Sequence, residues 1–495
     1  MTVQIRPQVL KDHLVRDFKM LIDGHWTAGS EGHTIERMAP SHGVLVSRYQ
    51  TATKHDVGRA IFAARKAFDH GHWPKMTAGE RSNILLKAVD LIAYLDAIEA
   101  GKPISQCRAE LGGAVDIWRY AASLARTLHG ESYNSLGEGT MGVVLREAIG
   151  VVSIITPWNF PFLIVSQKLP FALAAGCTTV VKPSELTSGS TLVLGEILLE
   201  AGVPDGVVNI LVGTGAEVGA VMTSHPEVDM VSFTGSTGVG RLTMASAAHH
   251  LKKVSLELGG KNPQIAFPDA NLDEFVDAAV FGAYFNAGEC CNAGSRLILH
   301  KDIAKDVTAR IAELSTKVKV GDPLDPSTQV GAIITPQHLE KISGYVAGAS
   351  EGGAKVAAGG SALDLGMGQY MAPTILADVT KEMAVAREEV FGPVLSVLTF
   401  ETMEEAIQIA NAVDYGLSAG VWSNSFDTCM TIGRKVRAGT IWMNTFMDGT
   451  PELPFGGYRQ SGLGRELGKH AVEDYTETKT LNMHIGRRTG WWMPH

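Results

Sequence analysis

Cysteine is scarce in this chain, and the few that occur are not arranged as a disulfide framework. The 495 residues contain an odd number of cysteines, with one adjacent pair. Small secreted domains, by contrast, are rich in paired cysteines. The pattern excludes a disulfide-stapled secreted protein and indicates a reducing compartment, which we expect to be the cytoplasm. The five cysteines are Cys107, Cys177, Cys290, Cys291 and Cys429.

Long apolar runs and basic blocks are missing as well. No apolar run approaches the roughly 18 to 20 residues that a membrane helix needs. The start of the chain, MTVQIRPQVLKDHLVRDF, mixes both charges around no apolar centre, unlike a secretory signal. The formal net charge of -9 is mild, and Lys and Arg form no block. We therefore expect neither a membrane nor a nucleic acid as a partner.

Glycine and apolar residues are abundant, in the pattern of a large α/β protein. The length suggests two or three domains, 45% of the residues are hydrophobic, and 54 glycines fit many tight turns. Short β-branched runs alternate with helical stretches, which predicts a doubly wound sheet of buried parallel strands. The five runs are 150–158, 178–185, 207–213, 229–236 and 252–260.

Three further parts of the chain are expected beside this sheet. The N-terminal part, through about Arg126, reads as helical after a short strand region near 20–26. A second α/β segment with its own strands covers about 262–476. The stretches 140–148 and 475–485 alternate like strands and could pair as a ribbon, whose exposed edge invites pairing with another subunit.

Cys291 is the candidate nucleophile. It lies in FNAGECCNAGSR, a glycine-flanked segment between a helical run and a strand. A free cysteine is more often a small buried hydrophobe, but a glycine-rich loop exposes functional groups and lets a substrate approach. A thiol at its reference pKa of about 8.5 is mostly protonated at neutral pH, so it needs an activator. The neighbouring Cys290 would point elsewhere and is assigned to packing.

Glu257 and Asn159 are candidates for a general base and an oxyanion donor. Glu257 ends the otherwise apolar run VSLELGG, where desolvation raises a carboxyl pKa towards the range of a base. A carboxylate that pairs with Lys261 or caps a turn explains the spacing equally well. Asn159, in TPWNFP, follows the carboxyl end of an expected strand, where open α/β sheets bind ligands. A turn asparagine between prolines explains it equally well.

Three segments compete as cofactor sites. GTGAEVG, at 213–219, follows a strand, but its spacing is one residue too long for the dinucleotide fingerprint. FTGSTGVG, at 233–240, follows a strand and opens a helix, whose free amides suit a pyrophosphate. KPSE, at 182–185, either offers a cation and a carboxylate to ribose hydroxyls or forms a solvated turn. None of the three decides the matter alone.

Taken together, these pieces resemble the aldehyde dehydrogenase family over nearly the whole chain. The resemblance implies a Rossmann-type cofactor domain (1–127 and 148–258), an α/β catalytic domain (259–474) and a small β ribbon for oligomerisation (128–147 and 475–495). This cofactor domain omits the standard GxGxxG. The seven motifs, in the family's order, are TPWNFP, KPSE, FTGSTGVG, LELGGKNP, FNAGECCNAGSR, EEVFGPV (388–394) and PFGGYRQSGLGRELG (454–468).

The same resemblance implies an activity and its residues. The chain would oxidise an aldehyde to the carboxylic acid with NAD, with NADP also usable and no metal, as a homodimer or homotetramer. Cys291 would be the nucleophile, Glu257 the general base, and Asn159 with the backbone amide of Cys291 the oxyanion hole. Lys168 and Glu466 match a proton path behind the base. The cofactor residues would be Trp158, Lys182, Ser184, Glu185, Gly235, Ser236, Glu389 and Phe391.

Two departures from the family and three alternative functions stay open. Glu289 stands where many members carry glutamine, and its charge near the thiol could shift substrate preference. The helical pattern between Ile92 and Ala93 is shorter than in relatives. The alternatives are a cofactor-free cysteine hydrolase, a non-catalytic descendant of an enzyme, and a CoA-acylating relative. The cofactor motifs count against the hydrolase, and the complete catalytic set counts against the non-catalytic protein. Glu257 counts against the CoA-acylating relative, because it favours water as the acceptor.

The residues expected around the aldehyde entrance suggest a substrate. By resemblance, the segment 444–457 borders this entrance, and it supplies Asp448 and Glu452. Aromatic walls with acids at a mouth suit cations, which leads to the hypothesis of an amino- or trimethylammonio-aldehyde. The alternative is that both acids are solvated and the tunnel accepts apolar chains. The expected tunnel residues are Trp118, Phe446, Trp158 and Phe160.

Overall fold

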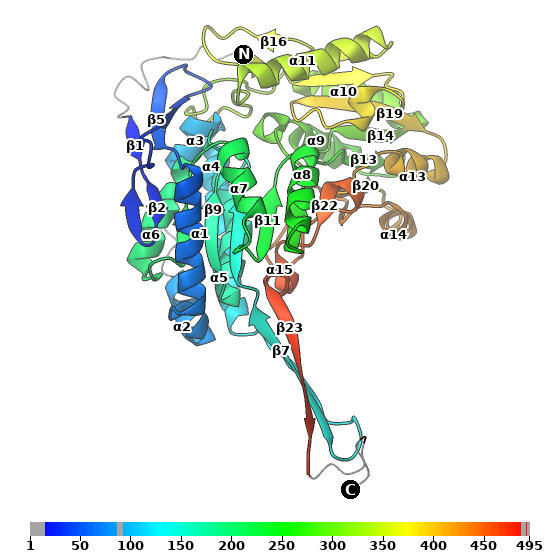
Figure 1. Cartoon of the computed structure of the whole chain (residues 1–495). Helices are drawn as coiled ribbons and strands as arrows, with labels where there is room; N and C mark the ends of the chain where they lie inside the picture. The colour runs from blue at the N-terminus through cyan, green and yellow to red at the C-terminus, as the bar shows by residue number, and fades with distance from the viewer. Residues whose placement is uncertain (1–14, 87–92, 487–491, 493–495) are drawn as a thin grey trace.

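Two largely parallel sheets organise the molecule (Figure 1). The structure is a computed structural model that describes residues 15–86, 93–486 and 492. The five central strands of the first, eight-stranded sheet are parallel, and each lies within one of the five predicted runs, so the predicted doubly wound sheet is confirmed. The strand order is β22 (Gly462–Leu463), β12 (Lys253–Glu257), β11 (Met230–Thr234), β8 (Val151–Ile155), β9 (Thr178–Lys182), β10 (Val208–Ile210), β2 (Met20–Ile22) and β3 (His25–Thr27).

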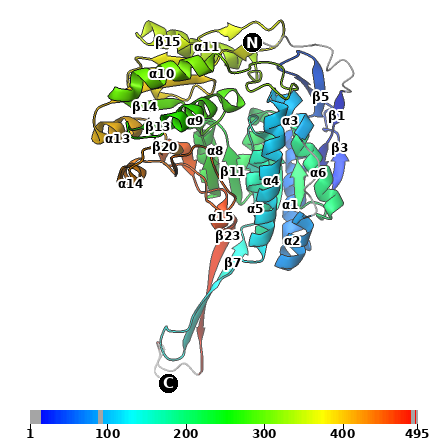
Figure 2. The same cartoon turned by 180° about the vertical axis from the view of Figure 1, so that it is seen from behind.

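Both faces of this sheet are covered by helices, as the alternation along β8 shows. Val151 and Ile155 contribute to one hydrophobic core, and Val152 and Ile154 to another. Successive strand side chains point to opposite faces, so a strand with buried apolar residues at both alternate sets of positions is covered on both sides. The first face carries α1 (Lys54–Asp69), α7 (Ala220–Ser224) and α8 (Thr237–Ala248); the second carries α5 (Pro161–Ala175) and α6 (Gly189–Ala201), with α4 (Ile104–Ala125) outside α5 (Figures 1 and 2).

The second sheet has seven strands and forms the core of the predicted second α/β segment. All of its neighbours pair in parallel except β15 with β18. The order is β15 (Lys355–Ala358), β18 (Thr374–Ala377), β19 (Val394–Phe400), β14 (Arg296–His300), β13 (Pro263–Ala266), β20 (Ser418–Trp422) and β21 (Thr440–Met443). Its helices are α9 (Leu272–Tyr284), α10 (Lys301–Ser315), α11 (Pro336–Glu351), α12 (Ala384–Arg387), α13 (Met403–Asn411) and α14 (Phe426–Lys435).

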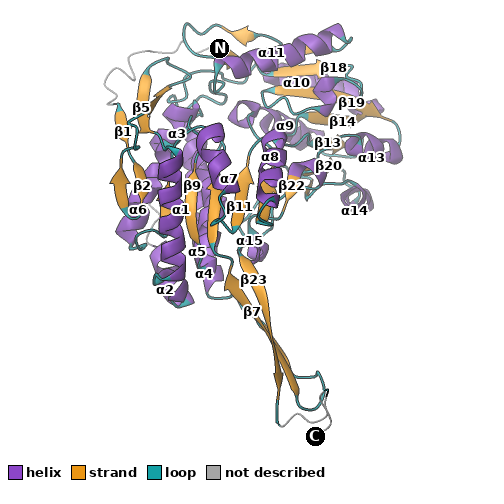
Figure 3. Cartoon of the chain, viewed as in Figure 1, coloured by secondary structure: helices purple, strands orange, loops and turns teal. Residues whose placement is uncertain are grey.

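The predicted ribbon is present and projects from the body of the molecule (Figure 3). Strand β7 (Thr140–Ala148) pairs antiparallel with β23 (Thr476–His484) along its whole length, and β6 (Glu131–Tyr133) adds a third strand. Helix α15 (Gly468–Asp474) leads into β23 at the root of the ribbon. Large apolar side chains are exposed on the ribbon and its loops: Tyr133, Leu136, Leu481, Met483 and Ile485.

The expected short strand region near 20–26 is confirmed by β2 and β3, and the expected helical part is correct from α1 onward but wrong between β3 and α1. A small sheet precedes α1, with the order β1 (Arg16–Phe18), β5 (Leu45–Gln50) and β4 (Thr34–Met38). In β4 the apolar Met38 is exposed and Arg37 is buried, because the Arg37 guanidinium donates to the carbonyl of Glu99. The reversed pattern hides the strand from an argument based on apolar alternation.

The remaining elements are short. Ile92 lies outside the described residues and α3 begins at Ala93, so the shortened pattern at that junction stays a sequence-based expectation. In the described part of the chain, no helix is long and apolar enough to cross a membrane. The short elements not yet named are η2 (Trp73–Lys75), α2 (Ala78–Leu86), α3 (Ala93–Ala100), η3 (Gly215–Gly219), η4 (Phe285–Gly288), β16 (Ala362–Leu363), β17 (Tyr370–Met371) and η5 (Arg459–Ser461).

Candidate active site

The parallel strands bring the predicted site residues to one edge of the first sheet. Neighbouring parallel strands end at the same edge, and ligands of open α/β sheets bind there. Glu257 is the last residue of β12, and Gly235 follows β11 directly. Asn159 follows β8, and Lys182 ends β9. Since these four strands are consecutive in the sheet, residues separated by about a hundred positions in sequence become neighbours.

The segment that carries Cys291 is held by left-handed backbone and by close contact with glycine. After α9, the residues Asn286, Ala287 and Gly288 have φ of 51°, 56° and 70°. The chain then lies against Gly260, where a β-carbon would stand 2.4 Å from the Cys291 carbonyl oxygen. That oxygen accepts a hydrogen bond of 2.9 Å from Asn262 Nδ2. The glycine therefore lets the Cys291 loop contact the segment that follows β12.

Of the five cysteines, all within the described residues, four are buried and Cys291 alone is partly exposed. The Cys290 thiol is buried and donates to Asn292 Oδ1 at 2.8 Å, in agreement with its assignment to packing. A hydrogen bond with the Cys290 thiol and then burial raise the pKa of Cys291 well above its ordinary value. Cys291 is therefore protonated at neutral pH and needs a base before it can attack, as the sequence argument expects.

Asn159 lies beside the Cys291 loop. Its Nδ2 donates to the Glu289 carbonyl at 3.0 Å, and Asn286 Nδ2 donates to the carbonyls of Asn159 and Glu289, both at 3.0 Å. Asn159 is therefore fixed to the loop that presents the thiol. Because an amide nitrogen carries two hydrogens, one remains for an oxyanion.

The Glu257 carboxylate is buried, and neither oxygen has a hydrogen-bond partner among the described residues. It lies against Gly456, where a β-carbon would stand 2.6 Å from Oε1. Burial and then the charge of Glu466 raise the pKa of Glu257 well above its ordinary value. The alternative of a pair with Lys261 is wrong, because no partner of Lys261 Nζ is found in the described part either. An unpartnered carboxyl with a raised pKa is suited to take a proton.

Behind Glu257, Lys168 and Glu466 form a buried ion pair. Lys168 projects from α5, and Glu466 follows β22. The positive charge of Lys168 lowers the pKa of Glu257, in opposition to Glu466. The pair therefore sets the field in which Glu257 ionises.

The cofactor candidates lie along the same edge. Ser236 caps the twelve-residue helix α8, and its Oγ accepts a hydrogen bond from Val239 N. The space that a side chain on Gly238 would occupy is open among the described residues, so the amides at the start of this helix are accessible. Lys182 Nζ donates to Glu185 Oε2 at 3.4 Å, which leaves the other carboxylate oxygen free for hydroxyls. The competing 213–219 segment forms the short helix η3 instead.

The other half of the cofactor site consists of aromatic rings and one carboxylate. Trp158 and Phe391 meet edge-on with centroids 5.5 Å apart, and the His338 ring lies near both. Glu389 Oε1 accepts from Gly260 N at 3.1 Å, so Glu389 lies next to the segment that follows Glu257. Ser184 accepts from Leu186 N at 3.3 Å within the KPSE turn. Thr156 directly follows β8, and Thr234 ends β11. Their buried hydroxyls have no partner within the described ranges, so polar groups are available to a bound ligand at this edge.

The side of the thiol away from the cofactor edge is apolar. Phe160, Ile164, Cys290 and Ala293 form a small cluster with Leu163, Phe285 and Met447 against it. Phe160 stacks on Phe285 at 6.1 Å, and the half-exposed Phe281 continues the row at 5.1 Å from Phe285. The expectation that Trp118 and Phe446 line the tunnel is wrong. Trp118 packs in the core of the first sheet and donates to Ser166 Oγ, and Phe446 packs in the core of the second.

Glu289 does not direct a charge at the thiol. Its buried carboxylate Oε1 accepts from Ile334 N at 3.0 Å and lies 3.9 Å from His338 Nε2. Burial raises the pKa of Glu289 well above its ordinary value. The side chain is therefore a buried structural contact with Ile334, and the expected effect of its charge on substrate preference finds no support in these contacts.

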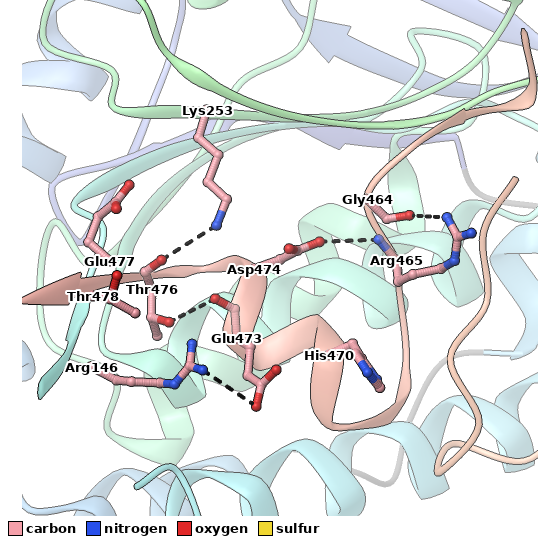
Figure 4. Close-up of a pocket in the computed structure, with 10 residues that line it drawn as sticks. All are labelled: Arg146, Lys253, Gly464, Arg465, His470, Glu473, Asp474, Thr476, Glu477 and Thr478. Atoms are coloured by element: carbon pink, nitrogen blue, oxygen red, sulfur yellow. Dashed lines mark hydrogen bonds and ion pairs between the residues drawn. The ribbon is translucent and has the colours of Figure 1, made fainter. Parts of the chain in front are cut away.

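A charged cleft of about 480 Å³ lies at the root of the ribbon, and none of the predicted catalytic residues lines it (Figure 4). Lys253 reaches it from β12, where alternation places Ser255 and Glu257 on the same face. A β-carbon on Gly464 would stand 2.7 Å from Ser255 Oγ and 3.0 Å from Asp474 Oδ2. The cleft therefore lies behind the base, on the far side from the cofactor edge.

Sequence reasoning missed four residues that shape this site. Asn262 and Gly456 lie inside recognised motifs, but only the structure shows that one holds the Cys291 carbonyl and the other contacts Glu257. Asn286 precedes Cys291 within its motif, and its left-handed φ has no sequence signal beyond the preference of asparagine for such backbone. His338 lies outside every motif, and no signal in the sequence singles it out.

Comparison with known proteins identifies the family of this chain. Residues 26–481 match the aldehyde dehydrogenase family. Aldehyde dehydrogenase family 2 member C4 of Arabidopsis thaliana is 42% identical over 476 residues, which cover 94% of this chain and 95% of that protein. An NAD-dependent aldehyde dehydrogenase from Sinorhizobium meliloti superposes with a TM-score of 0.97 at 45% identity, covering 99% of both chains. Betaine aldehyde dehydrogenase from Staphylococcus aureus, solved in complex with NAD+, superposes with a TM-score of 0.95 at 37% identity, again over 99% of both. The chain therefore belongs to the aldehyde dehydrogenase family, whose members oxidise aldehydes with a nicotinamide cofactor.

Proposed function

We propose that this chain oxidises an aldehyde to the carboxylic acid through Cys291, with NAD as the hydride acceptor. One observation carries the assignment of residues. Cys291, the one partly exposed cysteine of the five, lies on a loop that is hydrogen-bonded to Asn159. The first sheet ends beside this loop in the buried carboxylate of Glu257, which has no partner among the described residues. A nucleophile, an amide donor and a base are what acyl transfer requires.

In the first step, Glu257 accepts the thiol proton and the Cys291 sulfur bonds to the aldehyde carbon. The carbonyl π electrons move to oxygen, which becomes an alkoxide. Asn159 Nδ2 and the backbone N–H of Cys291 stabilise this oxyanion. Loss of one such donor typically costs about 2.7–4 kcal/mol of transition-state stabilisation.

The residues at the sheet edge fit a dinucleotide. The accessible start of α8 suits a pyrophosphate, and the free oxygen of Glu185 suits ribose hydroxyls. When bound, NAD supplies the acceptor for the hydride that leaves the former aldehyde carbon. The residues that would hold it are Trp158, Lys182, Ser184, Glu185, Gly235, Ser236, Glu389 and Phe391.

Departure of the hydride re-forms the carbonyl and leaves a thioester on Cys291, and Glu257 returns the thiol proton to solvent. In the last step, Glu257 takes a proton from water while the water oxygen bonds to the thioester carbon. The carbon–sulfur bond then breaks, Cys291 leaves as the thiolate, and the carboxylic acid is released. Because the Glu257 carboxyl is free to bind water, water is favoured over CoA as the acceptor.

The direct test is NADH absorbance with a panel of aldehydes. We expect aldehyde-dependent NADH formation and equimolar acid. Hydrolysis of thioesters or esters without NAD, and no NADH from any aldehyde, would instead identify a cysteine hydrolase. Acid formation that depends on CoA would contradict water as the acceptor.

For the substrate class, the contacts support an apolar or aromatic aldehyde over the cationic one suggested by the sequence. The row Phe160, Phe285 and Phe281 beside the thiol is apolar. Phe160 already has a cation, Lys102 Nζ, 3.8 Å from its ring centroid, and Lys102 is paired with Glu110. A further cation at this ring would be repelled.

The acids expected at the mouth do not face this row. Asp448 accepts from Thr445 Oγ1 within its own turn, and both Asp448 and Glu452 are exposed. Catalytic efficiency should therefore favour butanal and benzaldehyde over 4-aminobutyraldehyde and betaine aldehyde. An advantage for the charged aldehydes that Asp448→Asn and Glu452→Gln abolish would restore the cationic hypothesis.

The ribbon supports assembly into a homodimer or homotetramer. It exposes Leu481, Met483 and Ile485 along a strand edge that another subunit can cover. Light scattering should report a dimer or tetramer, and a stable monomer would contradict this. The domain boundaries 1–127 with 148–258, 259–474, and 128–147 with 475–495 belong to the same proposal. The first sheet, the second sheet and the ribbon support them, except that β22 of the 259–474 range pairs with β12 of the first sheet. The cytoplasmic location also belongs to this proposal and rests on the sparse cysteines.

A further inference from the structure

A chain of buried hydrogen bonds connects the ion pair behind Glu257 to the root of the ribbon. Lys168 Nζ, which contacts Glu466, also donates to Ser232 Oγ at 3.2 Å. Ser232 Oγ in turn lies 3.1 Å from the Tyr475 hydroxyl. All four side chains are at least nine-tenths buried, so bulk water does not replace these contacts.

One of the two hydroxyls lies in the strand next to Glu257, and the other lies at the root of the ribbon. Ser232 is the middle residue of β11, the strand next to β12 and its Glu257. Tyr475 lies between α15 and β23, where the chain leaves the body as the ribbon. Its carbonyl accepts from Ile149 N at 3.0 Å, which joins the end of β7 to the start of β23. The hydrogen bonds thus run from the ion pair behind Glu257 to the root of the ribbon.

We propose that Tyr475 is a positioning residue which, through Ser232, holds the Lys168 ammonium beside Glu466 and Glu257. Tyr475 touches no substrate or cofactor in this account and acts through Lys168 alone. The seating of the ribbon at Tyr475 is thereby coupled to the ionisation of the base. The proposal rests on the role of Glu257 given under the proposed function.

The charges around the base fix the direction of the effect. Glu257 faces Lys168 from α5, Glu466 and Arg465 from the segment after β22, and Asp474 from α15. Lys168 and Arg465 lower the pKa of Glu257, whereas Glu466 and Asp474 raise it. If Lys168 moves away from its place, its lowering effect weakens, and Glu257 ionises at a higher pH.

Among the described residues, no other cation acts on Tyr475. Burial raises the pKa of Tyr475 most, and the charges of Glu466, Asp474 and Cys177 raise it further. Its chain neighbours Asp474 and Thr476 line the cleft at the ribbon root, so solvent comes within one residue of the contact (Figure 4). A change in how the ribbon is seated therefore reaches Tyr475 first.

The test measures kcat and KM against pH, from about pH 5 to about pH 9, for Tyr475→Phe, Ser232→Ala and the double variant. We expect kcat to fall several-fold in each, well short of the roughly hundredfold loss for removing a general base. KM for aldehyde and NAD should stay within about twofold. The acid limb of kcat should move to higher pH, and the double variant should match the single ones, because both remove the same connection.

Tyr284→Phe is the matched control. Its hydroxyl forms the same kind of buried pair, 2.9 Å from Ser315 Oγ, in the second sheet's core. It should lose comparable stability and keep the wild-type pH profile. Ser232→Ala keeps the test decisive if Tyr475→Phe does not fold, since it removes the same contact without altering the ribbon.

Two results would overturn the proposal in distinguishable ways. If Glu257→Gln is inactive but Tyr475→Phe and Ser232→Ala keep the wild-type acid limb, the connection to Lys168 is refuted and the base is not. If Glu257→Gln keeps full activity, the assigned base fails and the connection fails with it.

Discussion

The carboxylate of Glu257 and the α-carbon of Gly456 are in direct contact: a β-carbon on this glycine would stand 2.6 Å from Glu257 Oε1. Gly456 also has φ of 155°, which side-chain-bearing residues rarely adopt. The glycine therefore makes room for the base, although it lies far from Glu257 in sequence.

Gly456→Ala should lower kcat at least about tenfold, because the new methyl displaces the carboxylate and strains the backbone by on the order of 1–3 kcal/mol. NAD affinity, measured by fluorescence titration, should stay within about twofold. Gly344→Ala, on α11 with no described atom within 4 Å of its β-carbon, is the control and should behave as wild type. Unchanged kcat in Gly456→Ala would mean that Glu257 does not occupy this place during catalysis.

The pH profile of kcat should show an acid limb well above about 4.3, the ordinary value for glutamate. Glu257 acts as a base only when deprotonated, and burial raises its pKa, so activity is lost as the pH falls through that raised value. Glu466→Gln removes a charge that raises the pKa of Glu257 and should move the limb down. Lys168→Met should move it up.

Both of these variants break a buried ion pair, so thermal unfolding must be followed in parallel, with a loss of roughly 3–5 kcal/mol expected. Shifts of the limb in the same direction for the two variants would refute the electrostatic account.

Catalytic efficiency should favour NAD over NADP. One oxygen of Glu185 is free beside Lys182, and its charge would repel a 2′-phosphate. Glu185→Gln should raise the NADP-to-NAD ratio of kcat/KM on the order of tenfold, about 1.4 kcal/mol. Glu200→Gln, an exposed site on α6, is the control. Equal or better efficiency of the wild type with NADP would contradict the role of Glu185.

Glu289→Gln should leave the ranking of aldehydes by kcat/KM unchanged. A glutamine oxygen keeps the hydrogen bond from Ile334 N, and burial raises the pKa of the carboxyl that it replaces, which favours the uncharged form. We expect stability within about 1 kcal/mol of wild type, measured by denaturant unfolding. A reordered aldehyde panel would show that the charge of Glu289 acts on the substrate after all.

The sequence predicts the central strands because these follow local rules, whereas the roles of the candidate catalytic residues come from the family resemblance. Each central strand is a short β-branched run, and Glu257, Asn159 and Lys182 lie at or just after strand ends, where parallel topology gathers them. The small N-terminal sheet is not predicted because β4 reverses the usual burial of apolar residues. Arg37 is buried, where its guanidinium donates to a backbone carbonyl, and Met38 is exposed.

The tunnel residues could not be predicted for a different reason. Trp118 and Phe446 are aromatic, but the direction of a side chain depends on neighbours distant in sequence. The Trp118 indole donates a hydrogen bond to Ser166, and the Phe446 ring fills the space left by Gly282, Gly294 and Gly420. The contact of Glu257 with Gly456 and the Ser232–Tyr475 bond are likewise fixed only by the packing of distant segments.

In the proposed mechanism, Cys291 carries the acyl group, and Glu257 releases it by activating water. The most direct measurement is mass spectrometry of Glu257→Gln after long incubation with NAD and benzaldehyde, followed by digestion and fragmentation of the peptide that contains both Cys290 and Cys291. The account predicts a benzoyl group on Cys291, retained in Glu257→Gln, short-lived in the wild type and absent from Cys291→Ser. A benzoyl group on Cys290, or rapid turnover by Cys291→Ser, would contradict it.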